Sequence, residues 1–150
     1  MKELLLAIES ELKSKQSVVP EGNISIVPWE SYLPSSSNTP AICIKDGPID
    51  IVRLAGDTDE KTMHVLIAVW VQILDQPGSS VVGVDPDPGV LELAKLVCSI
   101  LNDNMLSLSG MQDGYCIRER GSELMGAKTL TLQRKIVEFR YVREVENNPT

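Results

Sequence analysis

The amino-acid sequence predicts an α+β fold in which two main helices accompany a sheet of several strands. Three observations predict this class. Residues 62–74 alternate as one long strand, residues 88–101 carry a broad apolar helical stripe, and the segments after residue 114 are rich in strand-forming residues. The 150 residues are expected to form a single domain, large enough to bury a core without disulfides or metals.

The strand at residues 62–74 has two different faces. A continuous apolar face at period two is formed by Met63, Val65, Ile67, Val69, Val71 and Ile73. The opposite, mixed face is formed by His64, Leu66, Ala68, Trp70, Gln72 and Leu74. The first face requires a core. The mixed face is too apolar for plain solvent, so we expect it to meet another part of this chain or a neighbouring subunit.

Two segments have helical periodicity. The first runs from the N-terminus to about Ser17, with Leu4, Ile8 and Leu12 on one side and charged residues on the other. The second is expected to start at Pro88, with Asp87 as its N-cap, and to end before residues 102–104. Its apolar stripe is broad enough to be covered on more than one side.

The remaining strands are shorter or more polar. Residues 24–27 predict a short strand, and residues 29–40 a long loop whose first half is anchored by aromatic packing. The pair Asp46-Gly47 predicts a hairpin turn between strands at 41–45 and 49–54. Residues 56–61 predict a polar turn before the long strand. Strands at 115–120 and 129–143, joined by a turn at 121–126, close the sheet, and residues 146–150 form a flexible tail.

Composition excludes several classes of protein. The formal net charge of -7 argues against a dedicated nucleic-acid surface, because phosphate binding requires clustered Lys and Arg. The three cysteines are widely spaced in apolar contexts, which favours buried thiols over a disulfide framework or a zinc site. The N-terminal segment lacks a secretory signal, and no run reaches the length of a membrane span. We therefore expect a soluble product made in a cytoplasm.

Searching for catalytic or metal-binding residues yields no constellation. His64 is the single histidine; a nucleophile dyad with Cys43 or Cys116 is conceivable, but burial makes such thiols poor nucleophiles. Asp85 and Asp87 precede a helix and could cap it or bind a cation. We expect capping, because the proline after each of them already fixes the backbone geometry for it. No glycine pattern matches a phosphate-binding loop. The sequence thus predicts no catalytic residues, no metal and no cofactor.

The order of elements, together with residues 63–74, 88–101 and 134–141, resembles the small tail-terminator or tail-completion proteins of long-tailed bacteriophages. The resemblance implies an α+β fold with a mixed, mostly antiparallel sheet flanked by helices. It also implies a homo-hexameric ring in the virion, at the tail–neck region. Such a ring stops tail polymerisation on the tube protein and faces the head–tail connector or neck protein. These family members are not enzymes, and genome DNA passes through them without specific binding. An acidic chain suits that passage, because it repels phosphate.

Within this resemblance, two sets of residues are candidates for contacts. The candidates for subunit interfaces are His64, Leu66, Trp70, Gln72, Asp85, Asp87, Arg140 and Arg143. The candidates for contact with the tube or connector are Trp29, Tyr32, Asp57, Asp59 and Lys61. Two alternatives stay open. One is a neck or head-closure protein, and the other is a small cytoplasmic α+β enzyme or ligand-binding domain using His64, Asp85 and Asp87.

Overall fold

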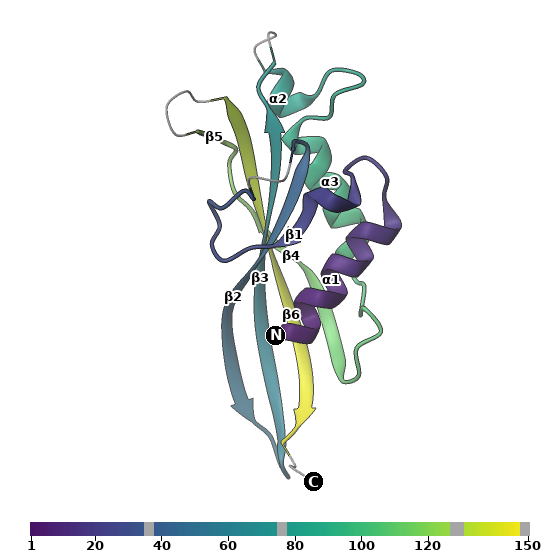
Figure 1. Ribbon diagram of the computed structural model, residues 1–150. Helices are drawn as coiled ribbons and strands as arrows, with labels where there is room; N and C mark the ends of the chain where they lie inside the picture. The colour runs from purple at the N-terminus through teal and green to yellow at the C-terminus, as the bar shows by residue number, and fades with distance from the viewer. Residues whose placement is uncertain (35–37, 75–77, 127–130, 148–150) are drawn as a thin grey trace.

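The computed structural model describes residues 1–34, 38–74, 78–126 and 131–147, which form one sheet with helices on one side (Figure 1). The helical elements are α1 (Lys2–Lys15), the 3-10 turn η1 (Glu21–Asn23), α2 (Ser79–Val82) and α3 (Val90–Leu101). The strands are β1 (Ile24–Ile26), β2 (Ala41–Arg53), β3 (Thr58–Gln72), β4 (Met111–Glu119), β5 (Glu123–Met125) and β6 (Leu132–Glu146). The predicted α+β class, with its mixed and mostly antiparallel sheet, is confirmed.

The sheet has the order β1-β2-β3-β6-β4, and β5 pairs separately with the start of β6. Only the β1–β2 pair is parallel. The predicted long strand lies at the centre, where β3 pairs with β2 on one side and with β6 on the other. β2, β3 and β6 extend well beyond the helices and form a narrow ribbon at the lower end of Figure 1.

One face of the sheet is covered by α1 and α3. The apolar face of β3 packs there with alternate residues of β6, including Val137, Phe139 and Tyr141. Leu4, Ile8 and Leu12 recur every fourth residue in α1, so all three point at the sheet and are fully buried. This face is the main core, as the alternation of residues 63–71 predicts.

The opposite face of the sheet has a second, smaller core. It contains Val27, Ala41, Cys43, Ala68, Trp70 and Ile136, with Leu33, Leu66, Met125 and Leu132 packed around them. Among the described residues, no helix lies on this side. The segment after β1 covers it with Val27 and Leu33, and Met125 of the paired strand β5 packs there as well. The mixed face of β3 is therefore partly covered by its own chain.

The predicted hairpin at Asp46-Gly47 is wrong. β2 runs straight through this pair, and the register with β3 shifts between Asp46 and Ile49. Pro48 has no N–H to donate, but this part of β2 is an edge because β1 pairs only as far as Ile44. A side chain at Gly47 would lie 2.8 Å from the carbonyl oxygen of His64. The Gly-Pro pair thus makes a bulge that lets two backbones approach, rather than a turn.

The predicted N-cap of the second main helix is also wrong. α3 begins at Val90 with Gly89 as its N-cap. Asp87 instead forms an isolated antiparallel β-bridge with Val84. A proline disfavours helical geometry in the residue before it, so Asp87 is kept extended by Pro88. The preceding segment contains the short helix α2, which was expected to be a connection.

The C-terminal half follows the prediction with shifted boundaries. β4 starts earlier than expected, and the expected turn at 121–126 contains β5. β6 reaches Glu146, and the backbone N–H of Asn147 donates to Asp57. The expectations for residues 148–150, for the first residues of the predicted strand at 129–130, for the serines at 35–37 and for the break at 75–77 lie outside the described residues. Within the described residues, no helix is both long and apolar enough to cross a membrane.

Candidate functional site: the mixed face and the ends of the sheet

Trp70 on the mixed face of β3 is covered by its own chain. Its side chain is 2% exposed and packs in the second core. Arg134, its register partner on β6, lies over the ring with its guanidinium carbon 5.7 Å from the ring centroid. Trp70 thus offers no surface to a neighbouring subunit. Its indole instead packs against residues 27–33 after β1, which we call the covering segment.

Arg134 fastens the covering segment to the sheet. This arginine is itself 4% exposed. Its guanidinium donates to the backbone carbonyl of Glu30 (3.0 Å), to Oγ of Ser31 (2.9 Å) and to the carboxylate of Glu123 (3.2 Å). One buried cation therefore connects β6 to the loop after β1 and to β5, which is a geometry that the planar guanidinium suits.

Arg120 fastens the same segment at a second point. It donates to Glu138 of β6 at 2.6 Å and 2.9 Å and also pairs with Glu30. The hydrogen bonds with Glu138, more than the charge of Glu30, raise the pKa of this guanidinium above its usual value. Two arginines reach Glu30 and anchor the first half of the loop at 29–40. The sequence predicts anchoring by aromatic packing, but Trp29 is mostly exposed.

Below this covered region the mixed face is open. His64 and Leu66 are half-buried there, and their partners across β6 are Arg140 and Glu138. Arg140 also reaches Asp113 of β4, at 3.7 Å. We call this half-buried part of the mixed face the open stripe; it consists of His64, Leu66, Glu138 and Arg140. Arg143 lies three residues after Arg140 on β6, so its side chain points to the opposite, helix-covered face of the sheet. There it pairs with Glu3 at 2.9 Å.

The structure does not bring His64 and a thiol together. Cys43 pairs with Ala68, four residues along β3 from His64, which corresponds to roughly 13 Å at strand spacing. Burial raises the pKa of Cys43 to about 11, so this thiol is protonated and unreactive near neutral pH. Cys116 pairs with Phe139 and belongs to the opposite face. Neither of the two conceivable dyads, which the sequence already disfavours, has the geometry for nucleophilic catalysis.

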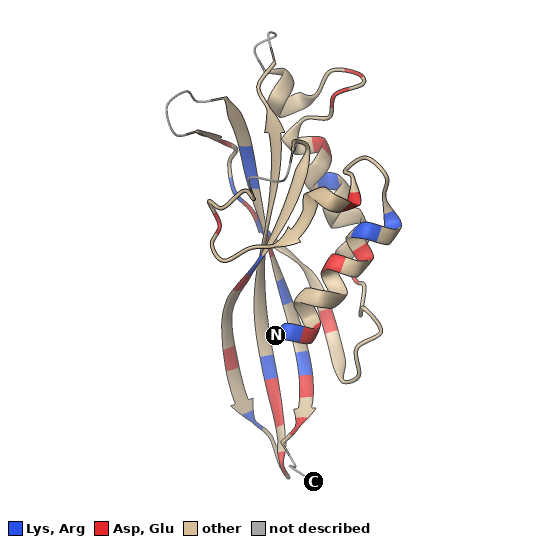
Figure 2. Cartoon of the chain, viewed as in Figure 1, with Lys and Arg blue, Asp and Glu red and all other residues tan. Residues whose placement is uncertain are grey.

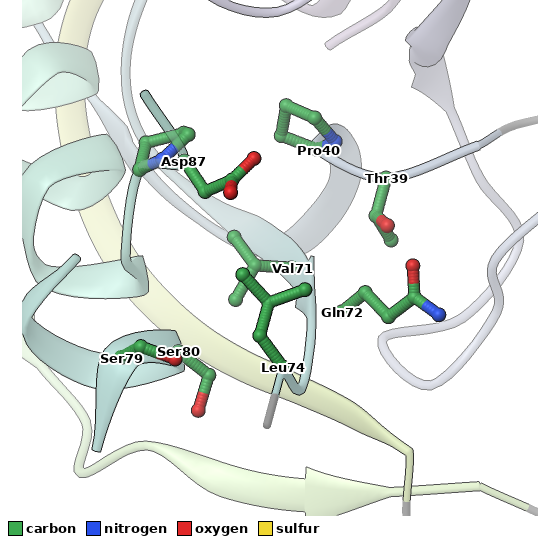
Figure 3. A pocket seen from close by; sticks show the side chains of 9 residues that line it. Thr39, Pro40, Val71, Gln72, Leu74, Ser79, Ser80 and Asp87 are labelled. Atoms are coloured by element: carbon green, nitrogen blue, oxygen red, sulfur yellow. The ribbon is translucent and has the colours of Figure 1, made fainter. Parts of the chain in front are cut away.

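A shallow pocket lies at the upper end of the sheet, beside α2 (Figure 3). Its lining comes from Thr39, Pro40, Val71, Gln72, Leu74, Ser79, Ser80, Asp87 and Pro88. Asp87 is the one ionisable residue of this lining, and its carboxylate faces the hollow in Figure 3. Asp85 and His64 do not contribute to it. The ligand-binding alternative therefore has one carboxylate in this pocket instead of the three converging groups it requires.

The candidates for tube or connector contacts fall in two separate places. Trp29 and Tyr32 form a T-shaped pair at 5.1 Å on the covering segment, with Trp29 56% exposed. Asp57, Asp59 and Lys61 lie at the free end of the ribbon. Asp59 is buried there and bonds to Arg53 and Asn147, so it holds the turn together. In the described part of the chain, no group of three His, Cys, Asp or Glu residues is arranged to hold a metal ion.

Two groups of residues were not singled out from the sequence. The first is the set that fastens the covering segment: Glu30, Arg120, Glu123 and Arg134. The second is a row of carboxylates at the ribbon end: Asp50, Glu60, Glu144 and Glu146. Their charges are visible in the sequence, but only the pairing register shows which of them share a face.

Comparison with known proteins gives a match in structure but none in sequence. No protein-family model matches the sequence, and no curated protein is similar to it in sequence. A chain of a solved structure titled "Virion of native gene transfer agent (GTA) particle" aligns with a TM-score of 0.63 and 14% sequence identity. The alignment covers 95% of this chain and 95% of that chain. The two chains share a fold. The similarity extends over nearly the whole of both, so it includes the ribbon as well as the helix-covered core.

Proposed function

We propose that this chain is a structural subunit of a phage-like particle, and specifically a ring subunit that terminates the tail tube and faces the head connector. The observation that carries the proposal is the shared fold with a chain of a virion, over 95% of each chain. In this function the chain acts through surfaces and not through a reaction. Its natural partners are copies of itself, the tail tube protein and a connector or neck protein.

The distribution of surfaces supports a role in assembly. Both cores of the sheet are buried by residues of the chain itself. The ribbon end and the open stripe around His64 and Arg140 stay accessible to partners. The exposed aromatic pair of Trp29 and Tyr32 adds a third surface, next to Glu30, to which Arg120 and Arg134 donate hydrogen bonds. Aromatic side chains on an ordered loop are typical anchors of protein interfaces.

The charge of the chain also supports this role. A net charge of -7 opposes binding of DNA phosphates, so a ring of such subunits lets DNA pass without holding it. The enzyme alternative finds less support, because His64 lies on β3 whereas Asp87 lies between α2 and α3, in a pocket that His64 does not line. Cys43 and Cys116 do not approach His64 either.

The experiment is a capping assay observed by negative-stain electron microscopy. Purified chain is added to tail tubes isolated from particles that lack it, and separately to filled heads that carry the connector. We expect extra density at one end of the tubes and no further growth when tube protein is supplied. Binding to the heads alone would assign the neck role instead, and binding to neither would refute the proposal.

The variant Trp29→Ala/Tyr32→Ala tests the aromatic pair in the same assay. These side chains are exposed, so the variant is expected to stay folded and to lose affinity for the tube or connector by at least tenfold. The matched control is Val82→Ala, which removes an exposed apolar side chain, 63% accessible, at a distant site on α2. Equal capping by all three proteins would exclude the aromatic pair as a contact.

A further inference from the structure

At the ribbon end, like charges stand directly opposite each other on both faces of the sheet. Glu60 of β3 pairs in register with Glu144 of β6, and the next residues, Lys61 and Arg143, also pair in register. Side chains opposite each other on antiparallel strands are about 5 Å apart at Cβ, where like charges destabilise the pair. Because neighbouring residues point to opposite faces, the ribbon end carries a carboxylate pair on one face and a cation pair on the other.

The charged residues on the carboxylate face of the ribbon end are all acidic. The register places Asp50, Val52, Thr58, Glu60, Thr62, Val142, Glu144 and Glu146 on it. None of these residues is basic, and within the described residues its four carboxylates have no ion pair. Val52 is 56% exposed between them. An isolated chain therefore leaves both the repulsion and an exposed apolar side chain uncompensated.

The opposite face of the ribbon end is the counterpart. A groove between the first turn of α1 and the ribbon is lined by Met1, Lys2, Glu3, Lys61, Met63, Arg143 and Val145. Three cations face one carboxylate in this groove. Ile49 and Ile51 continue the same face and are 40% and 59% exposed. Figure 2 shows the blue and red bands next to each other on the lower parts of β3 and β6.

We propose that the ribbon end is a head-to-tail docking surface for a second copy of this chain, with the carboxylate face of one copy on the cation face of the next. This inference rests on the proposed function and names the surface through which its ring would form. The two faces complement each other in charge, and each adds exposed apolar area. They are different surfaces, so the contact is heterologous and propagates from copy to copy until a ring closes.

The charges at this contact also explain why the Glu60–Glu144 pair is tolerated, whereas Arg143 already pairs with Glu3 in the free chain. In the assembly each carboxylate pair lies against cations, and each cation pair against carboxylates. The repulsion in the free chain then becomes attraction between copies. The contact should weaken with salt, because the screening length falls from about 10 Å at 0.1 M to about 3 Å at 1 M.

The test uses complementary charge reversal. Glu60→Lys/Glu144→Lys replaces the facing carboxylates by two cations, so the face loses its net negative charge. The variant keeps a like-charged pair, so folding is little affected. Lys2→Glu/Lys61→Glu makes the groove acidic and leaves the Arg143–Glu3 pair in place. The control Glu21→Lys/Glu119→Lys changes the net charge as Glu60→Lys/Glu144→Lys does, at exposed positions outside the ribbon end. Native mass spectrometry and sedimentation velocity at low salt report the oligomer.

We expect the wild type and the control to form closed oligomers and each reversed variant to be monomeric, with at least a hundredfold weaker association. An equal mixture of the two reversed variants should restore oligomers in which they alternate. Circular dichroism checks that each variant is folded; if Lys2→Glu/Lys61→Glu unfolds, Lys61→Glu alone takes its place. A monomeric wild type, oligomers of either folded reversed variant alone, or a mixture that stays monomeric would overturn the proposal.

These outcomes are separable from those of the capping assay. If the wild type caps tail tubes while the reversed variants assemble normally, the proposed function stands and this docking surface is wrong. If the complementary mixture reassembles but no chain binds tubes or heads, the docking surface stands and the proposed function is wrong.

Discussion

The guanidinium of Arg134 lies over the ring of Trp70 while donating to the backbone of Glu30, so one residue of β6 holds the indole and its cover together. Both side chains are almost fully buried, on the face of the sheet opposite α1 and α3. On this face a loop held by hydrogen bonds from Arg134 covers the core, as helices do on the other face. The stability of the second core and the position of Trp29 and Tyr32 therefore depend on the same cation.

Arg134→Met should destabilise the chain by about 2 kcal/mol, because it removes the cation–π contact and leaves the Glu30 carbonyl without its donor. The salt bridge to the half-exposed Glu123 adds little. Urea denaturation measures the free energy of unfolding. In a Trp29→Phe background, the emission of Trp70 should also shift to the red as the cover loosens. The control is Arg118→Met, which replaces an exposed arginine of β4. An equal loss of stability in the control would contradict the specific role of Arg134 in holding the loop.

The two tryptophans should differ sharply in their contribution to stability. Trp70→Ala leaves a large cavity in the second core and should cost about 3–5 kcal/mol. Trp29→Ala removes a mostly exposed ring whose main contact is Tyr32, and should cost less than about 1 kcal/mol. Thermal and urea unfolding of both variants measure the difference. Similar costs would mean that Trp70 is not part of a folded core.

Gly114→Ala should destabilise the chain by about 1–3 kcal/mol. A Cβ at Gly114 would lie 2.3 Å from the buried ring of Tyr141 on the neighbouring strand, and that ring has no room to move. Gly121→Ala is the matched control, because nothing lies within 4 Å of its added Cβ. We expect the control to unfold within about 0.5 kcal/mol of the wild type. A neutral Gly114→Ala would show that β4 does not pack on Tyr141 in this way.

Stability should fall as the pH rises above 9, partly through Cys43. Burial raises the pKa of this thiol from its ordinary 9.0 to about 11 in the folded chain. Between these values the unfolded chain loses the proton and the folded chain keeps it. The folded state is thus favoured fully below pH 9 and progressively less up to about pH 11, by up to about 1.4 kcal/mol per pH unit.

The measurement compares urea denaturation of the wild type and of Cys43→Ala at several pH values from 8 to 10.5. Other groups titrate in this range in both proteins, so the informative quantity is the difference between the two slopes. The variant is expected to be less stable at pH 8 and to lose less stability as the pH rises. Parallel curves would show that Cys43 ionises equally in the folded and unfolded chains.

The sequence predicts best where the pattern repeats along one element. Period-two alternation over residues 63–71 correctly identifies the buried face of β3, and the fourfold spacing of Leu4, Ile8 and Leu12 correctly identifies α1. It fails where a local signal has two structural solutions. Asp46-Gly47 is compatible with a turn or a bulge, and the edge position of β2 favours the bulge. Asp87 is a good N-cap by composition, but Pro88 keeps it extended.

By itself, the sequence determines the α+β class, the central strand and the two main helices, because periodicity and propensity act over neighbouring residues. The tertiary structure alone decided what the mixed face of that strand meets. Trp70 is covered by Arg134 and the loop it holds, whereas His64 and Leu66 remain half-buried on the open stripe below. It also decided that Glu60 faces Glu144 and that Lys61 faces Arg143. The physical reason is the register between β3 and β6, since a shift of one residue would move every charge of β6 to the other face of the ribbon.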